Sequence, residues 1–332
     1  MYTMHQSLAE RVWLAPMSGS TDAAFRRQAV RFGAEAVVSE MVAGETLAAA
    51  RPDVVRRTCR HEGRGRWIVQ LAARRPEDMQ RGAELLAEAG VDQIDINMGC
   101  PSRQVTGGQS GSALMKEPDL AKSIIDAALQ GAGGLPVSLK MRLGWDDQML
   151  NAPDLARYAQ SVGLCMITVH GRTRCQFYKG TADWERVRET VEAIDLPVLV
   201  NGDIEDCKTA DAALAASGAH GVMIGRAAMG RPWLLGEVSA HLAGRREWCA
   251  PSAVEKLDSL IEQVEDSMAL YGKALGLRIV RKHISAAVDH LDADWSDAER
   301  KELRARACGF EDAKPLFVFL NQLFEDRVQV AA

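Results

Sequence analysis

The stretch Gln93-Ile94-Asp95-Ile96-Asn97-Met98-Gly99-Cys100-Pro101 is a short run with apolar residues that ends in an amide, a glycine and a thiol. Seven more apolar runs have a polar, small or chemically capable residue at or just after their C-terminal end. The eight runs lie at residues 12–15, 36–38, 67–71, 93–96, 137–141, 166–169, 198–200 and 221–224. In a parallel barrel, catalytic groups gather at the C-terminal ends of the strands, where eight loops surround one mouth. The pattern therefore favours a parallel barrel that carries a cofactor.

The spacing of the runs predicts alternating strands and helices. Consecutive runs lie roughly one βαβ unit apart, and helix-compatible stretches occupy residues 77–89, 119–129, 153–162 and 207–216. Eight repeats in roughly 240 residues fit an eightfold parallel β/α (TIM) barrel better than an open doubly wound sheet. The first run leads into Ala15-Pro16-Met17-Ser18-Gly19, which lacks the glycine fingerprint of a Rossmann dinucleotide site. We therefore expect an α/β protein built on a TIM barrel.

The chain of 332 residues is long enough for a second, smaller domain of roughly 90 residues. Apolar residues recur at intervals of three and four in residues 252–271, 274–291, 297–307 and 315–328. We expect residues 1–243 to form the barrel and residues 244–332 a helical bundle. Residues 273–283 include four basic residues and no acidic one. This favours a binding role for the bundle, with a simple packing extension as the alternative.

Composition limits the class of protein. The apolar runs are too short to span a membrane, and the N-terminus lacks the features of a signal peptide, so we expect a cytoplasmic protein without membrane contact. Its seven cysteines include no Cys-x-x-Cys pair, which predicts free thiols and no metal site. The net charge of −5 argues against indiscriminate nucleic-acid binding but allows a local basic patch.

Two side chains at the expected mouth could take part directly in chemistry. Cys100 shares this mouth with Lys140 and His170, which is the setting of a nucleophile or a proton donor. A buried structural cysteine is the alternative. Lys140 could form a Schiff base or hold the anionic edge of a ring, unless it is an ordinary surface lysine.

A further set of residues suggests a flat ligand with a phosphate. Asn201-Gly202-Asp203 and Gly225-Arg226 follow the seventh and eighth runs, the positions where barrels commonly bind phosphate. Ordinary turns are the alternative. Gln70 needs hydrogen-bond partners that a ring with imide groups would supply. A phosphate, such a ring over Pro16 and Met17, and a nearby cation describe flavin mononucleotide (FMN), whereas a sugar phosphate would not explain Gln70.

In combination and in order, these motifs resemble the tRNA-dihydrouridine synthases, and they are most similar to the bacterial DusB group. The likeness covers almost the whole chain. It implies an FMN-bound barrel, a helical tRNA-binding domain, and reduction of uridine in the tRNA D-loop to 5,6-dihydrouridine with NADPH. The motifs are Leu14-Ala15-Pro16-Met17, Val69-Gln70-Leu71, Asn97-Met98-Gly99-Cys100-Pro101, Lys140-Met141-Arg142, His170-Gly171-Arg172-Thr173, Asn201-Gly202-Asp203, Gly225-Arg226 and Arg281-Lys282-His283.

The resemblance also implies roles for individual residues. Cys100 would deliver a proton to carbon 5 of uracil while a flavin hydride reaches carbon 6, and Asn97 is a candidate for holding the uracil edge. The cofactor residues would be Ala15, Pro16 and Met17 against the flavin ring, Gln70 and Lys140 on its polar edge, and Asn201, Gly202, Asp203, Gly225 and Arg226 around the phosphate, with His170 nearby. The tRNA backbone would meet Arg142, Arg172, Arg174 and Lys179 near the mouth and Arg278, Arg281 and Lys282 on the helical domain.

Three other functions stay open from the residues alone. The first is a flavin ene-reductase or dihydropyrimidine-type oxidoreductase of small molecules, in which the helical domain serves assembly. The others are a tRNA-binding protein without turnover and a Schiff-base lyase that uses Lys140. A monomer agrees with the resemblance.

Overall fold

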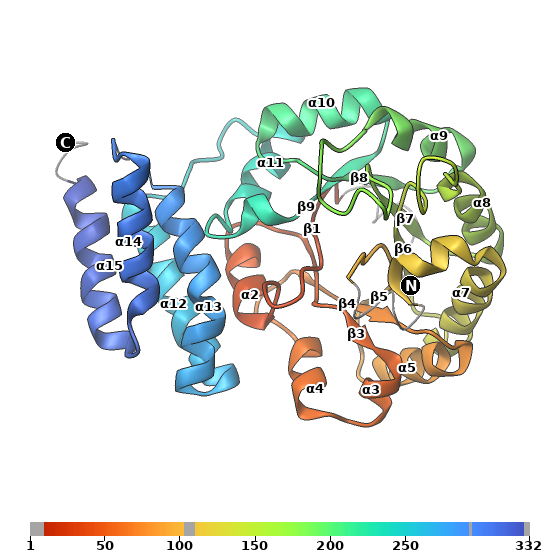
Figure 1. The fold of residues 1–332 in the computed structure, drawn as a ribbon, viewed down its shortest axis with the longest axis horizontal. Coiled ribbons are helices and arrows are strands. Elements are labelled where there is room, and N and C mark those ends of the chain that lie inside the picture. The colour runs from red at the N-terminus through yellow and green to blue at the C-terminus, as the bar shows by residue number, and fades with distance from the viewer. Residues whose placement is uncertain (1–9, 103–109, 292–293, 329–332) are drawn as a thin grey trace.

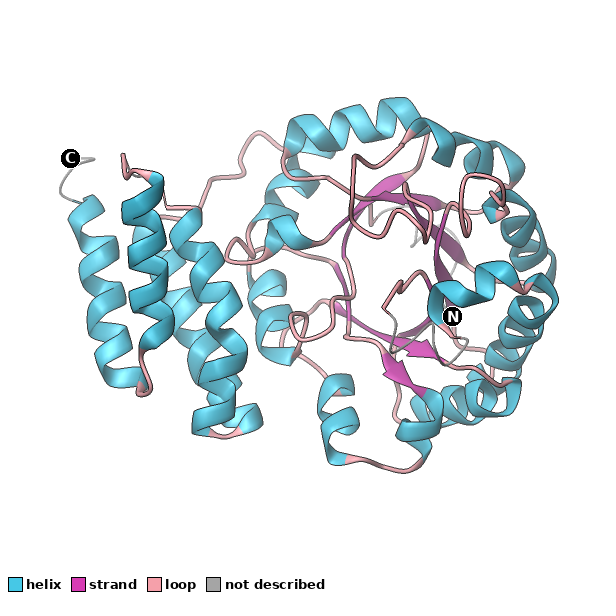
Figure 2. Cartoon of the chain, in the orientation of Figure 1, coloured by secondary structure: helices cyan, strands magenta, loops and turns pink. Residues whose placement is uncertain are grey.

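The computed structural model describes residues 10–102, 110–291 and 294–328. In these residues, eight parallel strands close into a barrel because β2 pairs with both β1 and β4 (Figure 2). A two-residue strand, β3 (Val42–Ala43), extends the pairing of β4. The predicted TIM barrel is confirmed. Its strands are β1 Val12–Leu14, β2 Ala36–Val38, β4 Arg66–Ala72, β5 Gln93–Met98, β6 Val137–Arg142, β7 Met166–His170, β8 Val198–Asn201 and β9 Gly221–Ile224.

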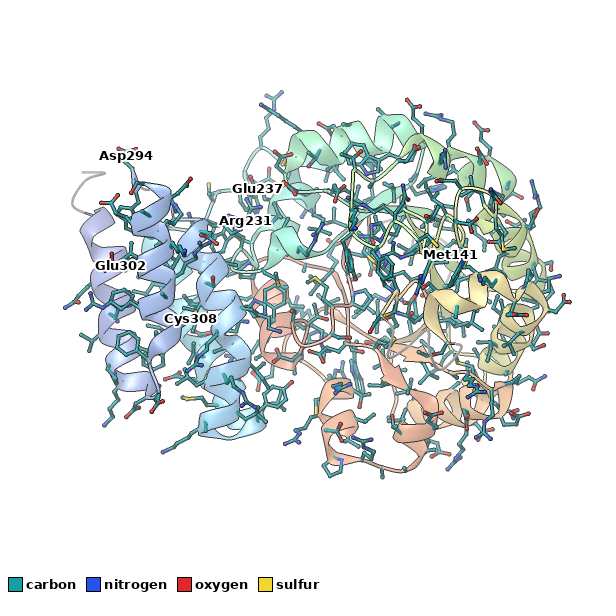
Figure 3. The ribbon with its side chains drawn as sticks, viewed as in Figure 1. Met141, Arg231, Glu237, Asp294, Glu302 and Cys308 are labelled. Carbon is teal, nitrogen blue, oxygen red and sulfur yellow. The ribbon has the colours of Figure 1, made fainter. Side chains whose placement is uncertain are left out.

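Strand β6 illustrates how the sequence sets the two faces of the barrel wall. Side chains of a strand alternate between its two faces. Leu139 and Met141 belong to the apolar layer between the strands and the surrounding helices, and Figure 3 labels Met141 on the barrel wall. Ser138 and Lys140 point the other way: Ser138 bonds to Asp95 on the neighbouring strand β5, and Lys140 bonds to Asn201 on β8. The outer face therefore holds the helices, while the inner face carries polar groups toward the mouth.

Helices cover the outside of the barrel (Figure 1). Four of them, α4, α5, α7 and α8, have proline in the first two positions, where its missing N–H removes no helical hydrogen bond. The helical elements of the barrel are α2 Ala23–Arg31, α3 Gly44–Ala48, α4 Pro52–Thr58, α5 Pro76–Glu88, η1 Gly111–Lys116, α7 Pro118–Ala132, α8 Ala152–Val162, α9 Glu185–Ala193, α10 Cys207–Ser217, η2 Arg226–Ala228 and α11 Leu234–Leu242.

A helical bundle follows the barrel and lies at one side of it (Figure 1). Its helices are α12 Ala253–Tyr271, α13 Lys273–Asp289, α14 Asp297–Gly309 and α15 Ala313–Val328. They pack around an apolar core of their own that includes Val264, Ile284 and Leu320. Among the described residues, no helix is both long enough and apolar enough to cross a membrane. The expected bundle is present, and the division at residue 243 stays a prediction.

The bundle is fastened to the barrel through α2 and the turn that precedes it. Gln28 accepts a hydrogen bond from Ser259 Oγ at 3.0 Å and donates one to Glu262 at 3.2 Å. His283 Nε2 of α13 donates to the backbone oxygen of Ser20 at 3.0 Å. Because Ser20 lies in the turn after β1, this bond brings α13 close to the barrel mouth.

The segment between β2 and β4 differs from the expectation of a simple strand, helix and strand. It contains β3 and two helices, α3 and α4, of 5 and 7 residues. Helices this short show less than two full apolar repeats, so periodicity does not predict them. This segment brings Arg56 and Arg57 to the mouth.

Gly230 is predicted to be needed for the junction between barrel and bundle. Its φ is +69°, and a Cβ there would collide with the backbone of Ala286 and Ala287 in α13. Gly244 is a matched control, because its φ of +66° is similar but no atom lies within 4 Å of its Cβ position. We expect Gly244→Ala to lower the free energy of unfolding by about 1 kcal/mol and Gly230→Ala by about 2–4 kcal/mol, since overpacking adds to backbone strain. Urea unfolding of both variants checks this, and equal losses would contradict it.

Candidate active site at the barrel mouth

A cavity of about 940 Å³ opens at the C-terminal ends of the barrel strands. This volume is in the range of ligand pockets, roughly 300–1,000 Å³. The cavity is lined by every residue predicted to bind the cofactor and also by Asn97, Cys100 and Arg142. The cofactor set comprises Ala15, Pro16, Met17, Gln70, Lys140, His170, Asn201, Gly202, Asp203, Gly225 and Arg226. Sequence positions spread over more than 200 residues therefore meet in one site.

The other wall of the cavity was not predicted. It is made of Arg56 and Arg57 from α4 and of Tyr271, Leu275 and Ile279 from the bundle. Leu275 and Ile279 are four residues apart on a helix, so they share one face. Their spacing was a usable signal, but the sequence alone does not reveal that this face turns toward the barrel.

The turn that carries Cys100 is held by side-chain hydrogen bonds. Asn97 Oδ1 accepts from the backbone N–H groups of Gly99 at 3.3 Å and Cys100 at 3.1 Å. Asn97 Nδ2 donates to Gln70 Oε1 at 2.6 Å, and Ser112 Oγ donates to the Cys100 backbone oxygen at 2.8 Å. Cys100 is a half-buried free thiol at the edge of the cavity. The site thus holds a thiol on a fixed turn, facing a space for a ligand.

Lys140 is a buried cation inside the barrel. Its Nζ donates to Asn201 Oδ1 at 2.9 Å, and Asn201 Nδ2 donates to the backbone oxygen of Met223 at 2.7 Å. Burial lowers the pKa of Lys140 to about 8, with a contribution from the positive charge of Arg142. Lys140 is therefore mostly protonated at pH 7 and can act as a hydrogen-bond donor with a positive charge.

The predicted phosphate end is organised by a carboxylate. Asp203 pairs with the buried Arg172 at 2.5 Å and with Arg226 at 3.3 Å. Burial raises the pKa of Asp203, but hydrogen bonds from Arg172 and the Ala182 N–H outweigh this and lower it. The Arg226 side chain is 60% exposed, so it keeps donors for a ligand. Asp203 orients the guanidinium that faces the cavity.

His170 lies between these cations and is neutral at pH 7. Burial, followed by the charges of Lys140 and Arg142, lowers its pKa well below the ordinary value. Its Nε2 lies 3.3 Å from Arg172 Nη1. Because a guanidinium has only donors, this histidine nitrogen accepts the bond.

Three arginines predicted to contact tRNA make side-chain contacts within the protein. Arg142 donates to the backbone oxygens of Gly99, Thr173 and Phe177, each at 2.8 Å, which ties the Cys100 turn to the loop after β7. Arg172 is also buried, and Arg174 stacks on the rings of Trp145 and Phe177 at 4.5 and 4.7 Å. Contact of these arginines with tRNA stays a prediction. In this structure they hold the loops of the mouth.

The basic residues of α13 point in different directions. A Cβ on Gly19 would meet Lys282 Nζ at 2.9 Å, so Lys282 reaches the rim of the mouth. Arg278 is exposed, whereas Arg281 donates to the backbone oxygen of Phe310 at 3.2 Å, toward α14. Lys282 is therefore available at the rim of the mouth, Arg278 is exposed on the same helix, and Arg281 supports the bundle.

Comparison with known proteins gives a consistent set of relatives. A family model described as "Dihydrouridine synthase (Dus)" matches residues 13–313. The chain is 44% identical to a "Probable tRNA-dihydrouridine synthase" of Rhodobacter capsulatus, over 95% of each chain. It is 41% identical to "tRNA-dihydrouridine synthase B" of Xanthomonas axonopodis, over 86% of each chain. The structure of histamine dehydrogenase from Rhizobium sp. 4-9 resembles this chain with a TM-score of 0.51 at 13% identity. The match covers 77% of this chain and 48% of the dehydrogenase chain, and it supports the fold alone.

The lowered pKa of Lys140 predicts a particular pH dependence of stability. Between about pH 8 and the ordinary value of 10.5, the unfolded chain binds more protons at this position than the folded one. We therefore expect the stability of the wild type relative to Lys140→Met to rise by up to about 3 kcal/mol from pH 8 to pH 10.5. Urea unfolding at several pH values measures this difference. The exposed Lys301→Met serves as the control, and a difference for Lys140→Met that does not change with pH would refute the assignment.

Proposed function

Because the chain belongs to the dihydrouridine synthase family, we propose that it reduces uridine in the D-loop of tRNA to 5,6-dihydrouridine, with bound FMN and NADPH. The observation that carries the proposal is the convergence of Cys100, Gln70 and Lys140 on one open cavity. On this proposal the protein is cytoplasmic, because its tRNA substrate is in the cytoplasm.

The residues of the cavity are compatible with FMN. Gln70 has both a donor and an acceptor, as an imide edge requires, and Lys140 adds a positive charge beside it. The Gly225 Cβ position lies 3.6 Å from Met17 Sδ and 3.7 Å from Ala15 Cβ, so the absent side chain leaves a smooth apolar floor for a ring. Arg226 and the glycines Gly202 and Gly225 would hold the phosphate.

Reduction of uracil requires a hydride at carbon 6 and a proton at carbon 5. Bound FMN would accept electrons from NADPH and supply the hydride. Cys100 would give the proton from its thiol, because it lines the cavity on a turn held by Asn97. Asn97 Nδ2 would help hold the uracil edge, and Lys140 would stabilise negative charge near the ring.

The substrate base must leave its stacked position to reach this site, since both atoms of the double bond are shielded inside a folded loop. A groove between barrel and bundle would admit it. We assign the tRNA backbone to exposed cations at the rim, Arg278 and Lys282 of α13 and Lys179 of the loop after β7. Residues 244–332 would then act as the tRNA-binding domain.

The proton-donor role of Cys100 predicts a rate loss without a binding loss. We expect Cys100→Ala to lower the single-turnover rate of uridine reduction by about 10²–10⁴-fold, as general acids contribute. The affinities for FMN and tRNA should stay unchanged. Dihydrouridine formed in tRNA that lacks this modification is the readout, and the exposed Cys175→Ala is the control. A Cys100→Ala variant as fast as the control would remove the thiol from the mechanism.

The tRNA-binding surface is tested by charge reversal on α13. We expect Arg278→Glu/Lys282→Glu to weaken tRNA binding by at least about tenfold and to reduce the salt slope by about 1 per lost phosphate contact. The matched control, Lys301→Glu/Lys314→Glu, makes the same charge change at exposed positions on α14 and α15. Binding is measured by titration at several salt concentrations. If both pairs weaken binding equally, this face of α13 is not the contact surface.

A further inference from the structure

Hydrogen bonds inside the barrel form a chain with two arms, and both arms end at the carboxyl group of Asp95. On the side of the N-terminal ends of the strands, Arg66 Nη2 donates to Gln93 Oε1, and Gln93 Nε2 donates to Ser138 Oγ at 2.7 Å. Ser138 Oγ then donates to Asp95 Oδ1 at 2.6 Å. These groups form the lower arm of the chain, which begins at a guanidinium and ends at a carboxylate.

An upper arm connects the same carboxylate to the Cys100 turn. Gln70 Nε2 donates to Asp95 Oδ2 at 2.7 Å, and Asn97 Nδ2 donates to Gln70 Oε1 at 2.6 Å. Asn97 Oδ1 in turn accepts the N–H groups of Gly99 and Cys100. Three hydrogen bonds thus separate Asp95 from the backbone of the proposed proton donor.

The direction of every bond in the upper arm follows from its two ends. Asp95 Oδ1 accepts from Ser138 and Oδ2 accepts from Gln70, so both carboxyl oxygens are acceptors, and a backbone N–H only donates. Asp95 therefore requires the Gln70 amide nitrogen on its side, which turns the Gln70 oxygen toward Asn97. That oxygen requires the Asn97 nitrogen, which leaves the Asn97 oxygen for Gly99 and Cys100. Reversing either amide would set donor against donor on one side of it and acceptor against acceptor on the other.

Burial of the Asp95 carboxyl group inside the barrel costs free energy. It is 1% exposed, and burial raises its pKa, although bonds from Ser138 and Gln70 and the charge of Lys140 act in the opposite sense. Buried polar and ionisable groups give little stability compared with well-packed apolar residues. Stability therefore does not by itself account for the place of Asp95 at the centre of the chain.

We propose that Asp95 is a positioning residue, which orients the Gln70 and Asn97 amides and thereby holds the turn that carries Cys100. The consequence for catalysis rests on the proposed function, because it takes Cys100 as the proton donor. The positioning itself does not, since it concerns bonds within this chain. Gln70 also lines the cofactor cavity, so the same carboxylate sets which of its atoms face a ligand there.

The simpler alternative is that Asp95 only satisfies polar neighbours inside the barrel. Ser138→Ala separates the two ideas, because it removes a donor to Asp95 from the lower arm and leaves the upper arm intact. If Asp95 is merely structural, Ser138→Ala and Asp95→Leu should disturb the Cys100 turn alike. If it is a positioning residue, only Asp95→Leu should do so.

The test measures hydrogen exchange of the Gly99 and Cys100 amides in the full-length protein, resolved by mass spectrometry of fragmented peptides. We expect Asp95→Leu to speed exchange of these two amides at least about tenfold, because their acceptor is no longer oriented. Ser138→Ala should leave them within about twofold of the wild type, whatever it does to the melting temperature. Equal exchange in Asp95→Leu and the wild type, or equal acceleration in both variants, would overturn the proposal.

A rescue variant provides the second arm of the test. In Asp95→Asn/Gln70→Glu, the new carboxylate at position 70 accepts from the new amide at position 95 and from Asn97, so every bond of the upper arm can form again. We expect slow exchange of Gly99 and Cys100 to return to within about threefold of the wild type. Fast exchange in this variant would refute the proposal, even if Asp95→Leu did not fold. Exchange needs neither FMN nor tRNA, so failure here is distinct from failure of uridine reduction.

Discussion

Buried polar groups must be hydrogen-bonded, and this constraint shapes the inside of the barrel. The outward side chains of the strands make an ordinary apolar layer, but the inward ones include Gln70, Asp95, Asn97 and Lys140. Each of these has at least one partner on another strand. A site built on such partners is fixed before a ligand arrives, which lowers the cost of organising it during a reaction.

The same constraint extends to the loops around the mouth. Arg142 and Arg172 are buried, yet their donors are used by backbone oxygens and by Asp203. They connect the loops after β5, β7 and β8 into one rim. The bundle adds the last wall, because the bond from His283 to Ser20 holds α13 beside the turn after β1. Fold and candidate site therefore depend on the same buried donors and acceptors.

Much of this arrangement could be predicted from the sequence, and the rest depended on distances that no pattern contains. Strand ends locate Cys100, Lys140, Asn201 and Arg226 at one mouth, because strand order in a barrel follows chain order. The sequence, however, does not show whether an arginine in a loop contacts solvent or a buried carboxylate. The bonds of Arg142 and Arg172 were therefore not foreseen. Arg281 and Lys282 are adjacent in sequence but about 100° apart around a helix, and only the packed bundle shows which one reaches the mouth. The hydrogen bonds of Asp95 were not foreseen, because its partners Gln70 and Ser138 lie on other strands.

The central claim is that the cavity holds a flavin which passes electrons to a uridine within tRNA. The most direct measurement is the visible spectrum of the purified protein in an anaerobic cuvette, first with NADPH and then with tRNA that lacks dihydrouridine. The account predicts flavin bands that bleach with NADPH and return on addition of this tRNA but not of free uridine. A colourless protein that does not take up FMN, or bands that return equally well with free uridine, would contradict it.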